Sequence, residues 1–312
     1  MSPISAAAAT PDAVCYRVRH ETRYSYTSTV LGGQQLAHLT PRATAWQTLL
    51  SHRIAIVPQV LDRSESTDYF GNHALRFLVD TPHDTLVVLA ESLVRIVSRL
   101  PAAAAGETPW EAALGQPYAG IGSVSDLDRV QYRLASPMVP LLAAAADYAR
   151  PSFTPGRSWL EAVTELTRRI YTEFEYDATA TTVTTGVAEV LEQRAGVCQD
   201  FAHLMVSCLR SLGMAARYVS GYVLNQVAEG QVALTGADAS HAWVEAWCPD
   251  IGWLAFDPTN GKLADTEFIT LGWGREFSDV TPLRGVVLGA ATQAPDVAVT
   301  VEPVADPEPV AP

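Results

Sequence analysis

Three residue types that together perform acyl transfer occur in order along the chain: a cysteine, a histidine and an aspartate. Cys198 lies in a loop that leads into an apolar helical run, His241 begins an alternating segment, and Asp257 precedes Pro258. A thiol attacks a carbonyl carbon well only as the thiolate, an imidazole beside it accepts the proton, and a carboxylate orients the imidazole. We therefore expect Cys198 to be a nucleophile, His241 its general base and acid, and Asp257 the orienting group.

The position of Cys198 at a predicted helix start favours its ionised form. Gly196 interrupts regular structure before it, and apolar residues follow at helical spacing up to Gly213. The N–H groups of a first turn are unpaired and the helix dipole favours an anion there, so the N–H of Cys198 is a candidate oxyanion donor. We expect Asp200 to cap this start, and His203, about 140° around the axis, to point away from Cys198. The same spacing also fits a cysteine that is simply buried in the core, which is the alternative interpretation.

Alternation predicts that His241 and Asp257 share one face of a β-hairpin. A strand beginning at His241 leads to a turn at residues 249–252, and a returning strand ends at Asp257. If Trp247 pairs with Trp253, the paired residue numbers have an even sum and Asp257 is the diagonal neighbour of His241, roughly 7–8 Å away at Cα. An odd sum would place the two side chains on opposite faces, so we predict the even register.

Further residues are candidates for the oxyanion site or the walls of a cleft. They are Gln199, Tyr222, Trp243 and Asn260. Gln199 and Tyr222 are candidate second oxyanion donors, and Trp243 shares the face of His241. Each also has a structural interpretation, since a tryptophan is ordinarily a core residue and an asparagine after Pro258 is an ordinary turn residue.

Composition argues against several other kinds of function. The 21 Lys and Arg against 34 Asp and Glu give a net charge of −13, which disfavours nucleic-acid and anionic-membrane partners. The four cysteines lack CxxC spacing, and neither an HExxH motif nor a phosphate-binding glycine loop occurs, so we predict no metal and no cofactor. No leader or membrane span is recognised and cysteines are few, so we expect a cytoplasmic protein. Nothing in the sequence indicates an oligomeric state.

Hydrophobic patterning divides the chain into segments. Residues 14–105 contain short alternating runs between turn signals, which predicts a β-sandwich-like domain. Residues 106–157 are a mixed linker and helical segment. Residues 158–290 form the α+β core, whose first helix begins with Ser158 as N-cap. Residues 291–312 are rich in proline and acidic residues and contain no Lys or Arg, so we expect a disordered tail.

The motifs resemble those of bacterial transglutaminase-like proteins of the papain-like cysteine superfamily. The resemblance rests on residues 196–203 (GVCQDFAH), 241–245 (HAWVE) and 256–260 (FDPTN), with 16–22 (YRVRHET) and 39–42 (LTPR) resembling the β-rich domain that precedes such cores. It covers most of residues 14–290. It implies a papain/transglutaminase-like fold, in which a helix bearing the cysteine packs on an antiparallel sheet, and a triad of Cys198, His241 and Asp257.

This resemblance implies thiol-dependent acyl transfer or hydrolysis at a peptide or side-chain amide, through a thioester on Cys198. Water as acceptor gives a cysteine protease or amidase, and an amine gives a transglutaminase. Gln199 stands where animal transglutaminases have tryptophan, and no calcium site is indicated. The expected partner is a protein or peptide substrate. The alternative from another class is a catalytically inactive peptide-binding or scaffold protein that uses the same cleft.

Overall fold

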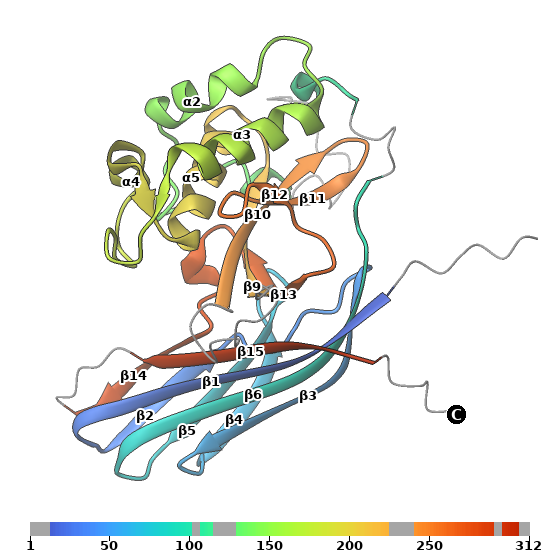
Figure 1. The fold of residues 1–312 in the computed structure, drawn as a ribbon. Helices are drawn as coiled ribbons and strands as arrows, with labels where there is room; N and C mark the ends of the chain where they lie inside the picture. Colours follow the sequence, from blue (N-terminus) through green and yellow to red (C-terminus); the bar gives the residue numbers. More distant parts are fainter. Residues whose placement is uncertain (1–12, 102–106, 115–128, 225–239, 290–294, 306–312) are drawn as a thin grey trace, which may run out of the picture.

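Two antiparallel sheets face each other in the lower part of the molecule in Figure 1. The computed structural model describes residues 13–101, 107–114, 129–224, 240–289 and 295–305. The first sheet has the order β15-β1-β6-β3, from β1 (Ala13–Val30), β3 (Gln47–Val57), β6 (His83–Val97) and β15 (Asp296–Val304). The second has the order β14-β2-β5-β4, from β2 (Gly32–Ala37), β4 (Asp62–Thr67), β5 (His73–Val79) and β14 (Leu283–Leu288).

A third antiparallel sheet lies above these two and carries the helices (Figure 1). Its order is β12-β11-β10-β9-β13, from β9 (Ala216–Val223), β10 (Ser240–Cys248), β11 (Gly252–Asp257), β12 (Lys262–Leu263) and β13 (Phe268–Gly274). A short parallel pair joins β7 (Glu175–Tyr176) to β8 (Ala195–Gly196).

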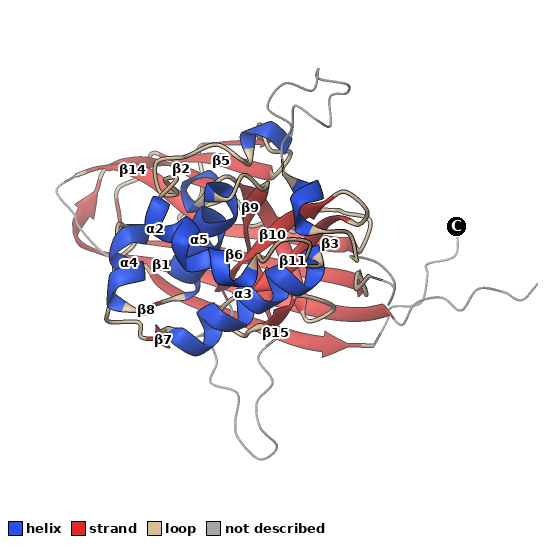
Figure 2. Cartoon of the chain, turned by 90° about the horizontal axis from the view of Figure 1, so that it is seen from above, coloured by secondary structure: helices blue, strands red, loops and turns tan. Residues whose placement is uncertain are grey.

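The helices form one layer, which Figure 2 shows in front of the strands. They are α2 (Ala143–Ala149), α3 (Trp159–Glu173), α4 (Val187–Gln193) and α5 (Cys198–Ser211), with short 3-10 turns η1 (Trp110–Ala113), η2 (Arg150–Ser152) and η3 (Phe277–Asp279). Ser158 caps α3 as predicted, accepting the N–H of Glu161 at 3.4 Å. Helix α5 is buried nearly all round, as expected for a central helix with few charges, and Gly213 follows it with φ +91°.

The long strand β6 serves two hydrophobic cores with one face. Successive strand residues point to opposite faces, so its even-numbered residues share a side. Along that side Val88 packs in the core between the first two sheets, whereas Val94 packs in a second core with Tyr222 and Ile269 of the third sheet. The first sheet therefore supports both the sandwich and the helix-bearing layer, and the predicted α+β fold class is confirmed.

The predicted disordered tail is wrong for the segment Asp296–Val304. This segment is β15 and pairs antiparallel with β1, from Cys15↔Val304 to Arg23↔Asp296. Its alternating valines supply an inward face, on which Val299 is 5% exposed. The acidic, proline-rich composition concealed this period-two pattern. Residues 291–294 and 306–312 of the predicted tail lie outside the described residues.

The predicted linker at residues 106–157 contains η1, α2 and η2 in its described parts. Residues 115–128 lie outside the described part of the chain, as do residues 225–239, where the sequence predicts a polar stretch before β10. Among the described residues, no helix has both the length and the apolar character that crossing a membrane requires.

Candidate active site

Cys198 is the first residue of α5, and the side chain of Asp200 fixes the backbone in front of it. The Asp200 carboxylate accepts the N–H of Val197 at 2.9 Å and the hydroxyl of Thr181 at 2.6 Å, which confirms the predicted capping role. A Cβ at position 196 would lie 2.8 Å from an Asp200 carboxylate oxygen, so only Gly196 fits this approach. The loop and the helix start are thereby held as one rigid unit.

The first turn of α5 leaves two neighbouring backbone donors unused. The N–H groups of Asp200 and Phe201 both return to the carbonyl of Val197, at 2.9 and 3.1 Å. The N–H groups of Cys198 and Gln199 donate to no acceptor within the described residues. Two such donors beside a thiol can receive an oxygen that becomes negatively charged.

His241 and Asp257 come together as the predicted register requires. Trp247 pairs with Trp253, which confirms the even sum. The Nε2 atom of His241 lies 2.8 Å from the Oδ2 atom of Asp257, and the carboxylate has no exposed surface. A buried carboxylate facing an imidazole is the arrangement that orients a catalytic histidine.

The carboxylate of Asp257 is held by the turn that follows it. Its Oδ1 atom accepts the backbone N–H of Thr259 at 2.8 Å, and its Oδ2 atom accepts the side-chain amide of Asn260 at 2.6 Å. Burial alone would raise the pKa of Asp257, but its hydrogen bonds to His241 and to this turn hold that pKa below its ordinary value. The group is therefore a fixed anion.

The imidazole of His241 is held in its charged form by its two neighbours. Burial would lower the pKa of His241, but the hydrogen bonds and charges of Asp257 and Cys198 raise it to about 10. Because Nε2 faces Asp257, Nδ1 is the ring nitrogen left for the thiol. Cys198 is half-buried, whereas Cys208 in the same helix is fully buried and burial raises its pKa to about 12. A cysteine of purely structural role would resemble Cys208.

The structure corrects two of the other site predictions. The hydroxyl of Tyr222 lies 2.9 Å from the Nδ1 atom of His20 on β1, so it belongs to the junction with the first sheet and not to an oxyanion site. Trp243 is fully buried and stacks on His241 at 6.2 Å between ring centroids, so it supports the imidazole from behind and does not wall a cleft. The alternation of side chains along a strand predicted which face of the sheet each residue occupies. It could not predict which other elements pack against that face.

Gln199, Asn260 and His203 also take structural positions. The Gln199 side chain donates to the carbonyl of Val183 at 3.2 Å, whereas its backbone N–H has no acceptor among the described residues. Asn260 binds Asp257 instead of facing a cleft. His203 accepts the N–H of Phe277 at 3.1 Å and burial lowers its pKa to about 4, so it is a buried, hydrogen-bonded helix residue.

Sequence reasoning missed Thr181 and Tyr218. Thr181 lies in a threonine-rich run, which was the only signal that hydroxyls approach Asp200. Tyr218 is on β9 with its ring against His203 and Phe277, and burial, followed by the negative charges of Cys198 and Asp200, raises its pKa well above the ordinary value.

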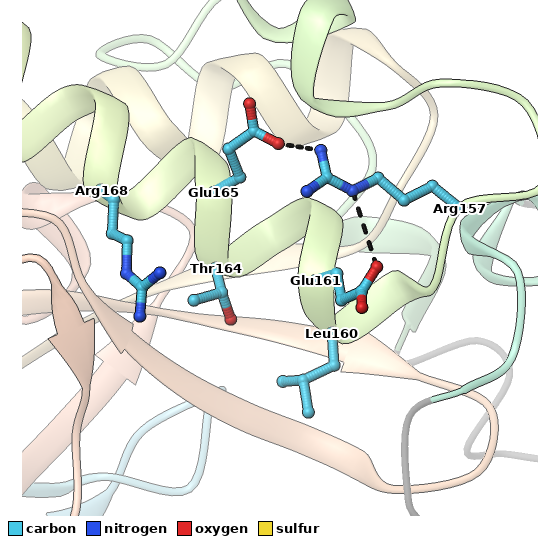
Figure 3. Close-up of a pocket in the computed structure, with 6 residues that line it drawn as sticks. All are labelled: Arg157, Leu160, Glu161, Thr164, Glu165 and Arg168. Carbon is cyan, nitrogen blue, oxygen red and sulfur yellow. Dashed lines mark hydrogen bonds and ion pairs between the residues drawn. The ribbon is translucent and has the colours of Figure 1, made fainter.

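A surface depression on the outer side of α3 contains none of these residues. Its lining residues are Arg157, Leu160, Glu161, Thr164, Glu165 and Arg168 (Figure 3). In Figure 3 the guanidinium of Arg157 turns toward Glu161 and Glu165, with which it forms ion pairs. Arg157 precedes α3, and its charge is balanced by these two glutamates of the helix. In the described part of the chain, no three His, Cys, Asp or Glu side chains are grouped to hold a metal ion.

Family models match both halves of this architecture. The model described as the transglutaminase-like superfamily matches residues 146–258, and that of the bacterial transglutaminase-like N-terminal region matches residues 16–95. The chain belongs to the transglutaminase-like superfamily. The resemblance inferred from the motifs is thereby confirmed.

Relatives of this superfamily member match either nearly all of the chain or only a part of it. The uncharacterized protein Rv2569c of Mycobacterium tuberculosis is 40% identical over 296 residues, 92% of each chain. A protein-glutamine gamma-glutamyltransferase of Pseudomonas aeruginosa is 41% identical over 76 residues, 24% of this chain and 11% of that protein. The crystal structure of a candidate cysteine protease from Cytophaga hutchinsonii is similar with a TM-score of 0.73 and 19% identity, covering 95% of this chain and 92% of the other. The last likeness shows the fold.

Proposed function

We propose that this transglutaminase-like protein transfers or hydrolyses the acyl group of a peptide or side-chain amide through a thioester on Cys198. The observation that carries the proposal is the 2.8 Å contact between His241 Nε2 and Asp257, because it leaves Nδ1 for the thiol of Cys198. A buried carboxylate, an imidazole that holds a proton and a half-buried sulfur at a helix start together favour a thiolate–imidazolium pair.

Acylation follows from this pair. The sulfur of Cys198 attacks the amide carbon, a sulfur–carbon bond forms, and the C=O π electrons move onto the oxygen. The N–H groups of Cys198 and Gln199 stabilise that oxyanion. As the C–N bond breaks, His241 donates its Nδ1 proton to the leaving nitrogen, and an amine departs from the thioester.

Deacylation runs through the same groups in reverse. Neutral His241 removes a proton from the acceptor, which attacks the thioester carbon, and the sulfur leaves as the thiolate. Water releases a carboxylic acid, whereas a primary amine forms a new amide. The partial match to a protein-glutamine gamma-glutamyltransferase supports an amine acceptor, and the likeness to a candidate cysteine protease supports water. Both reactions share the thioester, which is therefore the species to detect.

Trapping the acyl-enzyme tests the proposal directly. The full chain is incubated with a peptide library, quenched in acid and digested, and mass spectrometry searches for an acyl group on Cys198. We expect acylated Cys198 in the wild type and none in Cys198→Ala or His241→Ala.

Alkylation with iodoacetamide at neutral pH distinguishes an enzyme from a scaffold. We expect selective labelling of Cys198 that His241→Ala abolishes. Labelling of Cys198 no faster than that of Cys208, together with peptide capture that survives Cys198→Ala, would establish the inactive scaffold instead.

A further inference from the structure

A threonine-rich loop, residues 177–183, lies along the start of α5. The backbone N–H of Asp177 donates to the carbonyl of Gly196 at 3.0 Å, and the carbonyl of Val183 accepts the Gln199 side chain at 3.2 Å. These two contacts lie before and after the nucleophile in sequence. The threonine-rich loop is therefore fixed against the helix start at both of its ends.

Thr181, between these two contacts, is the threonine whose hydroxyl reaches the helix start. It donates to the Oδ2 atom of Asp200 at 2.6 Å, and Asp200 is only 2% exposed. The hydroxyl groups of Thr179 and Thr182 instead bond to side chains of their own segment. Burial raises the pKa of Asp200, and the hydrogen bond from Thr181 opposes that rise. Thr181 thus stabilises a buried carboxylate in its charged form.

The carboxylate of Asp200 in turn fixes the peptide unit in front of the nucleophile. The same Oδ2 atom accepts the N–H of Val197 at 2.9 Å, and the carbonyl of Val197 accepts the N–H groups of Asp200 and Phe201. Both backbone polar groups of Val197 are therefore held. Because a peptide unit is planar and trans, the N–H of Cys198 points opposite to that carbonyl and out of the helix start. The hydroxyl of Thr181 bears on this direction through one carboxylate.

We propose that Thr181 is a positioning residue, whose hydroxyl holds the Asp200 carboxylate where it aims the backbone N–H donors of α5 at the substrate carbonyl oxygen. The role rests on the proposed function of Cys198. Thr181 transfers no proton and contacts no substrate: the sulfur–carbon bond forms, the π pair moves onto the oxygen, and the backbone donors stabilise the resulting charge.

The expected size of the effect follows from the loss of alignment. Removal of one oxyanion donor slows acyl transfer about 10²–10³-fold, and a misplacement of about 1 Å can cost about 100-fold. Without the Thr181 hydroxyl the two donors remain but are held less firmly, since the bond from Val197 to Asp200 persists. We therefore expect at least about a tenfold loss of acylation rate.

Two reactions of the same sulfur separate the aim of the donors from the reactivity of the thiol. Acylation by p-nitrophenyl acetate passes through an oxyanion, whereas alkylation by iodoacetamide does not. In Thr181→Val, which keeps the branched shape and removes the hydroxyl, we expect the p-nitrophenolate burst to slow at least about tenfold and the alkylation rate to change less than about twofold. Thr181→Ser restores the hydroxyl and should recover most of the burst rate. Thr179→Val is the matched control, since it removes a hydroxyl bonded within the loop, and it should change neither rate.

Each other result has a defined meaning. A burst in Thr181→Val within about twofold of the wild type would overturn the role, and a lower Tm with unchanged rates would show that the hydroxyl only stabilises the fold. An equal fall in acylation and alkylation would also overturn it, because the hydroxyl would then act on the thiol and its histidine. If Thr181→Val does not fold, as thermal unfolding shows, Thr181→Ala replaces it with the same expected results. A wild-type burst no greater than that of Cys198→Ala would defeat the proposed function and, with it, this role.

Discussion

At the scale of single residues, the site depends on a histidine that is both buried and protonated. Burial works against the charge of His241, and the carboxylate of Asp257 restores it through a 2.8 Å hydrogen bond. This pairing was predictable because strand periodicity has only two phases, and one of them places both side chains on one face. The partner of Tyr222 was not predictable, because it lies on a strand about two hundred residues away in sequence.

Replacing Asp257 with asparagine should disable the thiol without unfolding the protein. The substitution removes the charge that raises the pKa of His241, so burial would dominate and the imidazole would lose its proton at neutral pH. We expect the p-nitrophenyl acetate burst to fall at least about 100-fold, as expected when the orienting carboxylate is lost. Asn260→Ala, which leaves the bond to Thr259, should cost less. Wild-type rates in Asp257→Asn would exclude the carboxylate from the mechanism.

The charge on His241 should also make stability depend on pH. The folded pKa of about 10 exceeds the ordinary value of 6.5, so protonated His241 stabilises the fold. This contribution is complete below pH 6.5 and is lost as the pH rises through about 10. We expect the difference in Tm between the wild type and His241→Gln to be largest near pH 6 and to shrink toward pH 10.5. A difference that grows with pH would contradict the raised pKa.

At the scale of elements, amide and charged side chains join the first two sheets to the third. Gln47 exchanges hydrogen bonds with the backbone of Thr270, at 2.7 and 2.8 Å, and Asn72 does the same with Trp273, at 2.8 and 3.0 Å. Both side chains pair with backbone N–H and C=O groups of the edge strand β13, as a neighbouring strand would. The helices were predictable from caps and a 3.6-residue period, but these amide contacts were not, since they depend on the docking of two sheets.

The buried carboxylate of Glu245, on the same strand as His241, provides a test of this junction. It accepts hydrogen bonds from Arg217 at 2.7 Å and from Arg99 at 2.8 Å, and it has no exposed surface. Removing one partner of a buried pair leaves an uncompensated charge, so Glu245→Gln should lower the free energy of unfolding by about 3 kcal/mol. Glu91→Gln breaks the exposed pair with Arg53 and should cost no more than about 1 kcal/mol. Urea denaturation measures both, and equal costs would contradict the argument.

At the scale of the whole molecule, the sandwich is not continuous in sequence. Its strands β1–β6 precede the helix-bearing layer, and β14 and β15 follow it (Figure 1). Hydrophobic pattern and motifs identified both layers, but the return of the chain escaped prediction. Strand β15 was read from its composition as a tail, and composition carries no information about the edge of β1 to which it pairs.

Truncation should show that β15 is structural. Ending the chain after residue 290 removes β15 and exposes one edge of β1, together with the core that Val299 covers. We expect a lower Tm and a greater tendency to aggregate, because an open edge strand pairs with other chains. Ending the chain after residue 305 keeps β15 and should leave both properties unchanged. If both truncated chains have the same Tm as the full chain, β15 contributes nothing to the stability of the fold.

Because β14 and β15 follow the helix-bearing layer in sequence, the two sheets of the sandwich can be completed only after that layer has been synthesised. The strands made first cannot complete their sheets until β14 and β15 leave the ribosome, so β1 and β2 each wait with one side unpaired while the helix-bearing layer is being translated. The same chain order limits recombination between relatives. The helix-bearing layer of one relative can replace that of another only through two junctions, one before it and one after it. An exchange at a single junction would separate β1 and β2 from their partners β15 and β14.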